Sequence, residues 1–345
     1  MLEKIHNFME FKMNYIEEDL NNIAEFIKNL ESSTVLVTGA TGLIGSLCVK
    51  AMQKNGKIPV IAMARNENKV KALYEETEGI KFLYQEITDP LPKDLRCDYI
   101  IHTANPTSSK YFISNPVEVI DCIYEGTKQI LEFARINKIK GVVYLSSMEV
   151  FGVVNEARRV REDELGIIDI QNIRSCYSEG KRHAELLCKC YAEEYDVNVV
   201  IDRLAQTFGA GIPKTDNRVF KQFANSATKG EDIVLHTTGK SFGNYCYTRD
   251  ALKAIFLILT KGKKGDVYTV VNEETTTTIS QMASMVAERF SRGQSKVVFD
   301  IPENNLYGYA PETRLKLSSK KLRDLGWEPE IPLEEMYERM INNEK

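Results

Sequence analysis

A glycine-rich turn between a short apolar strand and a helix constrains the fold of this chain more than any other feature. The turn spans residues 39–45 and reads Gly-Ala-Thr-Gly-Leu-Ile-Gly, directly after a strand predicted over Thr34–Thr38. Glycines at this spacing allow a tight turn and close approach of a pyrophosphate, which the amides of the helix start can bind. Such a triplet alone can be only a turn, but the flanking strand and helix favour a dinucleotide site. The predicted phosphate-binding residues are Gly39, Thr41, Gly42, Leu43, Ile44 and Gly45.

Short apolar strands alternate with helical segments from residue 34 to about residue 205. This alternation is typical of a parallel sheet with crossover helices. We therefore predict an α/β fold, with a Rossmann-type doubly wound parallel sheet over residues 33–205. A smaller C-terminal lobe, mainly for substrate binding, is expected over residues 206–345, where the alternation loosens. The predicted strands are Thr34–Thr38, Pro59–Ala64, Lys81–Tyr84, Tyr99–His102, Gly141–Ser146 and Val197–Arg203, and one helix is predicted over Pro116–Asn137.

An appended helix is predicted before the first strand, within residues 1–32. Its apolar residues recur three and four positions apart, which marks one face of a helix, at Ile16, Leu20, Ile23, Ile27 and Leu30. This face either packs on its own domain or forms a contact between subunits.

Charge and composition limit the partners of the chain. The net charge is −4, so no basic surplus exists to bind a nucleic acid or an anionic membrane. Acidic residues interrupt the apolar positions near the N-terminus, and no apolar run approaches the roughly 20 residues of a membrane helix. The seven cysteines are scattered, which predicts buried free thiols, no metal site and a cytoplasmic location.

The residues after the second predicted strand bear on the choice of cofactor. Dinucleotide sites usually place a carboxylate there to bind the ribose 2′-hydroxyl, whereas this chain has Ala64-Arg65-Asn66. An arginine without the carboxylate accommodates a 2′-phosphate, so Arg65 favours NADP over NAD. Arginine can also stack on adenine without contacting the phosphate, which leaves NAD open.

Tyr177 and Lys181 stand four residues apart, which places them on one face of a helix. The charge of the lysine is expected to lower the pKa of the phenol, so that Tyr177 can accept a hydroxyl proton near neutral pH. Ser146-Ser147 end a predicted strand about 30 residues earlier. Together with the glycine turn, these residues predict a catalytic group of Ser147, Tyr177 and Lys181.

This combination resembles the extended short-chain dehydrogenase/reductase family, also called NAD-dependent epimerases/dehydratases. The resemblance covers about residues 34–332 and includes the Leu325-Gly326-Trp327 stretch near the C-terminus. Residues 146–152 (Ser-Ser-Met-Glu-Val-Phe-Gly) and 174–182 (Arg-Ser-Cys-Tyr-Ser-Glu-Gly-Lys-Arg) are most similar to UDP-glucuronate decarboxylases and dTDP-glucose 4,6-dehydratases.

The resemblance implies further contacts and an assembly. Thr103 and Ala104 would line the cofactor, Glu86 and Ile87 would lie near its adenine, and Ser147 would bind the sugar oxygen that is oxidised. A homodimer would form through the helix of Tyr177 and Lys181 and its neighbour. The implied substrate-binding residues are Asn105, Gln206, Thr207, Arg218, Val219, Phe220 and Lys240, of which Phe220 could equally be a core residue.

The implied chemistry begins with hydride transfer from a sugar carbon, usually C4, to the nicotinamide while Tyr177 takes the hydroxyl proton. The keto-sugar is then epimerised, dehydrated or decarboxylated. Glu149 stands where the hexose dehydratases carry the base that removes the C5 proton, although it could equally be a supporting carboxylate. Met148 replaces their aspartate acid and cannot donate a proton. Gly243 replaces the substrate-binding arginine of the decarboxylases, and Lys240 could compensate for it.

We therefore predict an NAD(P)-dependent nucleotide-sugar epimerase or dehydratase. Two alternatives stay open. An NADP-dependent reductase or dehydrogenase would release the changed cofactor in each turnover. A cofactor-binding regulatory protein would retain the fold without catalysis.

Overall fold

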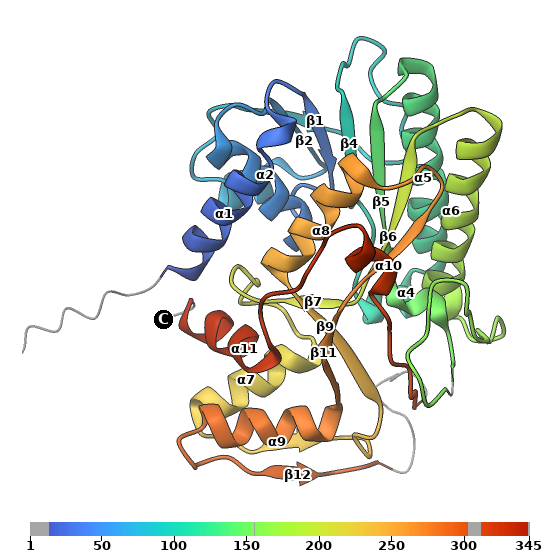
Figure 1. Cartoon of the computed structure of the whole chain (residues 1–345). Helices are drawn as coiled ribbons and strands as arrows, with labels where there is room; N and C mark the ends of the chain where they lie inside the picture. Colours follow the sequence, from blue (N-terminus) through green and yellow to red (C-terminus); the bar gives the residue numbers. More distant parts are fainter. Residues whose placement is uncertain (1–13, 155, 303–311, 344–345) are drawn as a thin grey trace, which may run out of the picture.

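A seven-stranded parallel sheet forms the larger of two lobes in the computed structural model, which describes residues 14–154, 156–302 and 312–343 (Figure 1). The strand order is β10-β6-β5-β4-β1-β2-β3, and every neighbouring pair is parallel. The order reverses between β1 and β4, and ligands of such sheets bind at the carboxyl ends of the strands beside this point. The strands are β1 (Val35–Thr38), β2 (Val60–Ala64), β3 (Ile80–Tyr84), β4 (Tyr99–His102), β5 (Gly141–Ser147), β6 (Val199–Leu204) and β10 (Val267–Val270).

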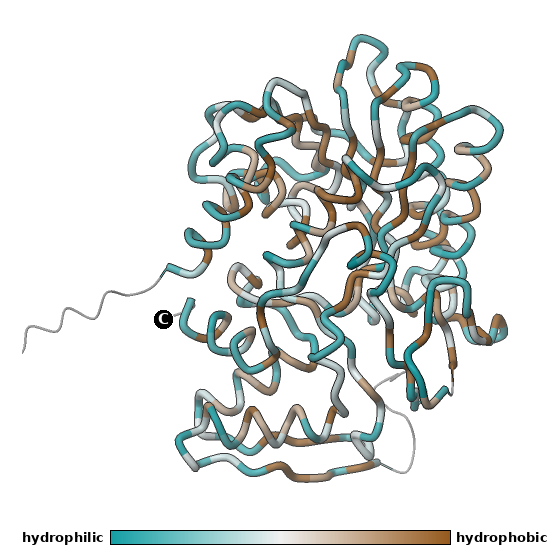
Figure 2. The backbone as a smooth tube through the Cα atoms, in the orientation of Figure 1, coloured by the Kyte–Doolittle hydropathy of each residue, from teal (hydrophilic) through white to brown (hydrophobic). Residues whose placement is uncertain are grey.

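Helices cover both faces of this sheet. One face packs against α2 (Leu43–Asn55) and α8 (Thr248–Lys261), and the other against α5 (Pro116–Asn137) and α6 (Ser175–Glu194). Strands buried on both sides are mostly apolar, and all residues of β1 and β2 are buried, with Thr38 as their one polar residue. Figure 2 accordingly shows the strands as predominantly hydrophobic segments in the centre of the lobe. The predicted Rossmann-type sheet is confirmed. Two short helices, α3 (Glu67–Leu73) and α4 (Ser109–Ser114), complete this lobe.

The predicted N-terminal helix is present as α1 (Tyr15–Phe26), followed by a 3-10 turn at Lys28–Leu30. Leu20, Ile23, Ile27 and Leu30 are buried in the same core cluster as α2. The apolar face therefore packs on its own domain, as the first of the two interpretations predicts. Residues 1–13 of the predicted element lie outside the described residues.

In the described part of the chain, the smaller lobe contains a three-stranded sheet, a two-stranded sheet and the helices α7, α9 and α11 (Figure 1). Phe208, Phe220, Tyr245 and Tyr337 contribute large rings to its core. The chain does not divide cleanly at residue 205, because α8 and β10 return to the larger lobe. The elements are β7 (Gln206–Phe208), β9 (Phe242–Tyr247) and β11 (Asn272–Thr278), β8 (Ile233–Leu235) and β12 (Val297–Phe299), and α7 (Val219–Lys229), α9 (Ile279–Phe290) and α11 (Leu333–Asn342), with α10 (Lys320–Asp324) near β10.

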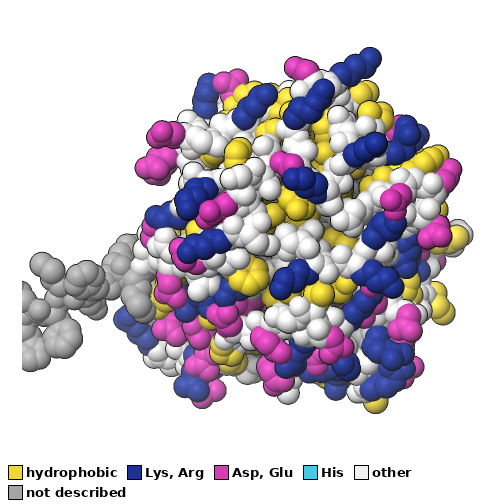
Figure 3. All heavy atoms as spheres, turned by 45° about the horizontal axis from the view of Figure 1, so that its top comes forward, with side chains coloured by type: hydrophobic (Ala, Val, Ile, Leu, Met, Phe, Trp, Pro, Cys, Tyr) yellow, Lys and Arg dark blue, Asp and Glu magenta, His cyan; other side chains and the backbone are white. Residues whose placement is uncertain are grey.

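The structure allows the expectations drawn from charge, hydropathy and cysteine content to be compared with the molecule. Within the described ranges, no helix combines the length and the apolar composition needed to span a bilayer. Figure 3 shows Lys and Arg interspersed with Asp and Glu on the face it views. All seven cysteines are free thiols, but only Cys48, Cys188 and Cys246 are buried. The expectation of uniformly buried thiols is therefore wrong, because Cys190 lies on an exposed position of α6 and the other three are half-buried.

Candidate functional site

The glycine turn follows β1 and has no room for a side chain at Gly39 or Gly45. Gly39 has a φ of +68°, and an added Cβ would lie 2.7 Å from Thr103 Oγ1 and 2.9 Å from the backbone of Ala104. A Cβ on Gly45 would lie 2.4 Å from the Gly39 carbonyl oxygen. Gly42 caps α2 without a side-chain hydrogen bond, which leaves the first amides of that helix for a ligand. These residues fit the diphosphate of a dinucleotide.

Replacing Gly45 by alanine is expected to lower the affinity for NAD or NADP at least about tenfold, because one hydrogen bond or phosphate contact to ionised groups is worth about 1.5–3 kcal/mol. The new methyl must push the turn away from the start of α2, since the Gly39 carbonyl oxygen is backbone and cannot rotate aside. Fluorescence titration of the reduced cofactor measures the loss, and circular dichroism checks that the chain is folded. Affinity within twofold of the wild type would contradict the assignment of the turn.

Residues after β2 and β3 meet at the edge expected to face the adenosine. Arg65 lies 3.6 Å from Glu86, and both side chains are mostly exposed. Ile87 is buried, where its side chain packs against Gly126 of α5. Asn66 is engaged in capping α3, since its side chain accepts from the Lys69 amide. Among the described residues, the carboxylate paired with Arg65 thus lies in the loop after β3 rather than in the loop after β2.

The loop after β4 is organised by Thr38 and His102. The hydroxyl of Thr38 accepts from the amides of Thr103 and Ala104, each at 3.2 Å, and lies 2.8 Å from His102 Nδ1. Burial lowers the pKa of His102 to about 3, so this histidine is neutral and structural. Both polar side-chain atoms of Asn105 are buried without a partner in the described part of the chain. Asn105 therefore keeps its hydrogen-bonding capacity for a ligand.

The last three residues of β5 are each held by a residue of α6. Lys181 Nζ donates to the Leu145 carbonyl at 2.6 Å, and Ser146 Oγ donates to Glu185 at 2.5 Å. Tyr177 interacts with Ser147, which favours its phenolate form, and its ring stacks on Phe112 with 4.3 Å between centroids. Residues 177, 181 and 185 are spaced four apart on one helical face, so α6 aligns the strand end in register. The predicted group of Ser147, Tyr177 and Lys181 is thus brought together.

The prediction that Lys181 lowers the pKa of Tyr177 is wrong. Burial raises the pKa of Tyr177, and the nearby Glu149 raises it further. Burial also lowers the pKa of Lys181 to about 7, and its Nζ lies 5.9 Å from the centre of the Tyr177 ring. A buried lysine that is half neutral at pH 7 gives little electrostatic support to a phenolate. Sequence spacing shows which groups are close but not how strongly they are desolvated.

The lowered pKa of Lys181 predicts how stability depends on pH. Between about pH 7 and the ordinary lysine value of 10.5, the unfolded chain holds a proton that the folded chain has released. Stability from this group therefore rises with pH across that window, by about 2–3 kcal/mol from pH 7 to pH 9. Urea unfolding of the wild type and of Lys181→Met at both pH values measures the difference. Equal pH dependence in the two proteins would contradict the assignment.

Glu149 is held by two partners that the sequence did not reveal. Arg174 binds its carboxylate through two nitrogens, at 2.9 and 3.0 Å, and Ser178 Oγ donates to it at 3.2 Å. Both oxygens of the Glu149 carboxylate are therefore engaged by protein groups in this structure. Arg174 stands three residues before Tyr177, but no local pattern in the sequence links it to Glu149.

The predicted substrate residues of the smaller lobe differ in burial, and they do not all face one site. Thr207 lies on β7, where its carbonyl accepts from Arg218 at 3.3 Å, and Gln206 is half-buried beside it. Arg218 is also paired with Asp216. Phe220 is fully buried and stacks on Phe208 in the lobe core, so the alternative interpretation of Phe220 as a core residue holds instead of substrate binding. Val219 is half-buried at the start of α7, and Lys240 is exposed.

The space beside Gly243 is filled by another side chain. A Cβ on Gly243 would lie 2.2 Å from the hydroxyl oxygen of Tyr245. Tyr245 itself is fully buried, so it cannot move aside without disturbing the core. An arginine at position 243 is therefore incompatible with this packing.

A model of the NAD dependent epimerase/dehydratase family matches residues 35–272. UDP-glucuronic acid decarboxylase 6 of Arabidopsis thaliana is 28% identical over 322 residues, which cover 92% of this chain and 89% of the relative. UDP-glucuronic acid decarboxylase 1 of Danio rerio is 27% identical over 92% of this chain and 74% of the relative.

Two solved structures share the fold. UDP-glucose 4-epimerase from Thermotoga maritima has a TM-score of 0.78 at 22% identity and covers 90% of this chain and 98% of its own. dTDP-glucose 4,6-dehydratase from Bacillus anthracis, solved with NAD, has a TM-score of 0.74 at 20% identity and covers 91% and 96%.

Proposed function

The chain belongs to the NAD-dependent epimerase/dehydratase family, and from this premise we propose that it is a nucleotide-sugar epimerase or dehydratase. The observation that carries the proposal is the convergence of Ser147, Tyr177 and Lys181 at the end of β5, beside the loop that holds Thr103 and Ala104. With a nicotinamide as hydride acceptor, this group would take the proton as a sugar hydroxyl is oxidised to a ketone and return it when the ketone is reduced.

The chain's own residues account for the proton transfers. Tyr177 accepts the proton of the sugar hydroxyl, and Ser147 donates a hydrogen bond to the same oxygen. Lys181, when its amine is protonated, would add positive charge beside the phenol and so favour the phenolate that accepts this proton. Gly39, Gly42 and Gly45 would hold the diphosphate of the cofactor, whose nicotinamide would accept the hydride and give it back. The phenol of Tyr177 returns the proton when the ketone is reduced.

Epimerisation is favoured over dehydration by the residues next to Ser147. Elimination of water needs an acid for the leaving hydroxyl and a base for the C5 proton. Met148 cannot supply the acid, and Glu149 is engaged by Arg174 and Ser178. Epimerisation needs neither group, since the keto-sugar only has to turn over in the site.

Decarboxylation is a second candidate, because the relatives that span most of the chain are named as UDP-glucuronic acid decarboxylases. The substrate-binding arginine expected of that activity is absent at Gly243, where Tyr245 fills the space. Lys240 is exposed and offers a single point charge in its place.

Mass spectrometry of the products from UDP-, dTDP-, GDP- and CDP-sugars tests these activities. An isomer of unchanged mass indicates epimerisation, loss of one water indicates dehydration, and loss of carbon dioxide from a uronic acid indicates decarboxylation. Release of reduced cofactor in proportion to product would indicate the net dehydrogenase instead. Cofactor binding without any product would favour the regulatory protein and overturn the proposal.

For the cofactor, we propose that NADP is accepted at least as well as NAD. The proposal depends on Arg65, which is exposed just after the end of β2 and lies 3.6 Å from Glu86. Arg65→Ala is expected to raise the Kd for NADP about tenfold, because a charged hydrogen bond to phosphate is worth about 1.5–3 kcal/mol. The Kd for NAD should stay within about threefold. Titration of the wild type and the variant with both cofactors measures these Kd values. The proposal would be contradicted if the wild type prefers NAD and the substitution does not change that preference.

We also propose a homodimer in the cytoplasm. Val117 and Ile120 on α5 and Leu186 on α6 are 64%, 44% and 60% exposed, on two helices that pack side by side. A second copy of the chain would cover these apolar side chains. Light scattering of the wild type should give twice the chain mass, and Leu186→Glu should lower the measured mass toward that of one chain.

The cytoplasmic location is supported by the seven cysteines, which are all free thiols and so suit a reducing compartment.

A further inference from the structure

The appended helix α1 contacts both lobes. Its second half is buried in the core of the larger lobe through Leu20 and Ile23. Its first turn faces the smaller lobe, where the Ile16 amide donates to Asn343 Oδ1 at 3.3 Å, just beyond the end of α11. In Figure 1, α1 accordingly lies beside α2 and extends toward α11. The helix α1 therefore packs on the larger lobe and also contacts the smaller lobe, which links the two.

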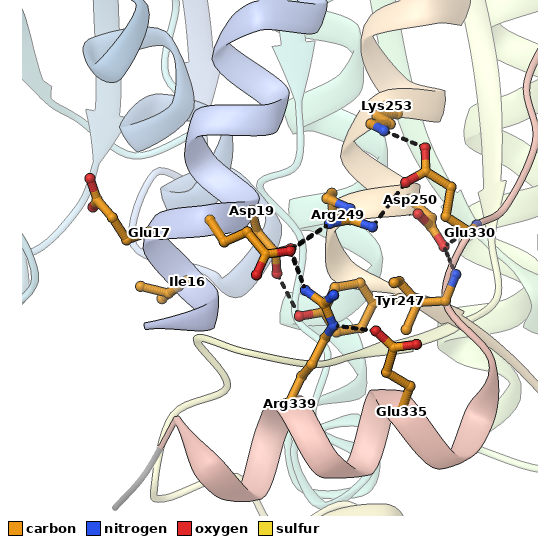
Figure 4. Close-up of polar contacts among 12 residues, drawn as sticks. Ile16, Glu17, Asp19, Tyr247, Arg249, Asp250, Lys253, Glu330, Glu335 and Arg339 are labelled. Carbon is orange, nitrogen blue, oxygen red and sulfur yellow. Dashed lines mark hydrogen bonds and ion pairs between the residues drawn. The ribbon is translucent and has the colours of Figure 1, made fainter. Parts of the chain in front are cut away.

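Asp19 is the centre of this connection (Figure 4). Its side chain is buried and accepts from three donors on three different elements. Tyr247 Oη at the end of β9 lies 2.5 Å away, Arg249 Nη1 on α8 lies 3.2 Å away, and Arg339 Nη1 on α11 lies 3.3 Å away. A buried carboxylate that satisfies two guanidinium groups and a phenol fixes all three in one geometry. Glu18 also accepts from both arginines, at 3.4 and 3.1 Å.

Tyr247 links Asp19 to the strand that carries the expected substrate contacts. It pairs with Phe208 in the parallel register of β7 and β9. Its ring also fills the space beside Gly209, where an added Cβ would lie 2.2 Å from the ring edge. Gln206 and Thr207 immediately precede this point on β7.

The loop that follows β7 is held between α1 and α2. A Cβ on Gly211 would lie 2.8 Å from the side chain of Ile16 on α1 and 3.4 Å from Leu47 on α2. The helix α2 begins at the glycine turn. The loop at residues 209–212 thus touches the appended helix on one side and the helix of the cofactor site on the other.

We propose that α1 is a positioning element for substrate binding, with Asp19 and Tyr247 as positioning residues. Together they hold β7 and residues 209–212 at a fixed distance from α2, so that Gln206 and Thr207 meet a nucleotide sugar without prior rearrangement. Preorganised contacts lower the cost of binding, so the connection acts on substrate affinity more than on the chemical step. This inference rests on the proposed function for the identity of the substrate.

Tyr247→Phe in the full chain tests the proposal most cleanly, because it removes only the hydroxyl that donates to Asp19 and keeps the ring against Gly209. The expected result is a KM for the accepted nucleotide sugar that rises about 5- to 20-fold, with kcat within threefold and cofactor Kd within twofold. Asp19→Asn, in which Glu18 still pairs with both arginines, should give the same pattern. Glu17→Gln is the matched control, since Glu17 lies on the same helix but pairs with Lys54 of α2, and it should leave all three constants unchanged.

Hydrogen exchange provides a readout that does not depend on turnover. Amides of residues 206–212 should exchange at least about tenfold faster in Tyr247→Phe and Asp19→Asn than in the wild type, whereas amides of α5 and α6 should not change. Unchanged exchange at residues 206–212, or an unchanged KM in both variants, would overturn the proposal. If the wild type converts no nucleotide sugar, the proposed function fails, and the exchange experiment together with the Kd for UDP then decides the role of α1 separately.

Discussion

Replacing Tyr177 by phenylalanine is expected to lower kcat by about 10²–10⁴-fold while the Kd for the cofactor stays within about threefold. The phenol is the group that takes the hydroxyl proton, and proton transfer by a positioned side chain contributes a factor of this size. The phenylalanine ring can keep the stack on Phe112, so the shape of the site is preserved. Steady-state kinetics with the accepted nucleotide sugar and titration of the cofactor measure the two effects separately.

Tyr191→Phe is the matched control for this experiment. Tyr191 lies on the same helix, and its hydroxyl donates to Glu132 on α5 rather than to the site. Turnover in this control should equal that of the wild type within twofold. Turnover of Tyr177→Phe near the wild-type value would remove Tyr177 from the mechanism.

Replacing Glu185 by leucine is expected to lower the free energy of unfolding by about 3–5 kcal/mol, because it leaves the Arg203 guanidinium buried without its counter-charge. The two side chains are 6% and 4% exposed and form a bidentate pair. Ser146 Oγ also donates to Glu185, so the substitution frees the end of β5. Urea unfolding measures the loss, and kcat should fall as well, since Ser147 follows Ser146 directly.

Two further variants identify the cause of that loss. Glu193→Ala, at an exposed position of the same helix, should change stability by less than about 0.5 kcal/mol. Glu185→Leu combined with Arg203→Met should recover most of the lost stability, because replacing both members of a buried pair by apolar residues is often neutral. A double variant as unstable as Glu185→Leu alone would show that the unpaired charge is not the cause.

Most of the larger lobe could be predicted from local patterns in the sequence. The six predicted strands agree with β1 to β6 to within two residues at each end, and the helix over Pro116–Asn137 is α5. Strands buried on both faces give continuous apolar runs, which are readable without tertiary information. The seventh strand, β10, lies beyond residue 205, where the regular alternation is lost, and its position beside β6 is set by a long-range contact.

The site residues that belong to a sequence motif could be predicted, whereas the contacts that arise from tertiary packing could not. The spacing of Tyr177 and Lys181 and the end of a strand at Ser147 indicate residues that meet. The pair of Glu149 with Arg174 joins two segments 25 residues apart, and no local pattern signals it. The filling of the space at Gly243 by Tyr245 is likewise a property of the packed lobe. The pKa of Tyr177 was predicted in the wrong direction because desolvation depends on the whole fold.

The central claim is that the enzyme oxidises a nucleotide sugar and reduces the same molecule again within one turnover. Mass spectrometry of the product from a nucleotide sugar deuterated at the oxidised carbon, C4 in this proposal, tests it most directly. The account predicts that the product retains the deuterium in full, and that Tyr177→Phe yields almost no product. Deuterium that leaves with released, reduced cofactor would contradict the account and establish a net dehydrogenase instead.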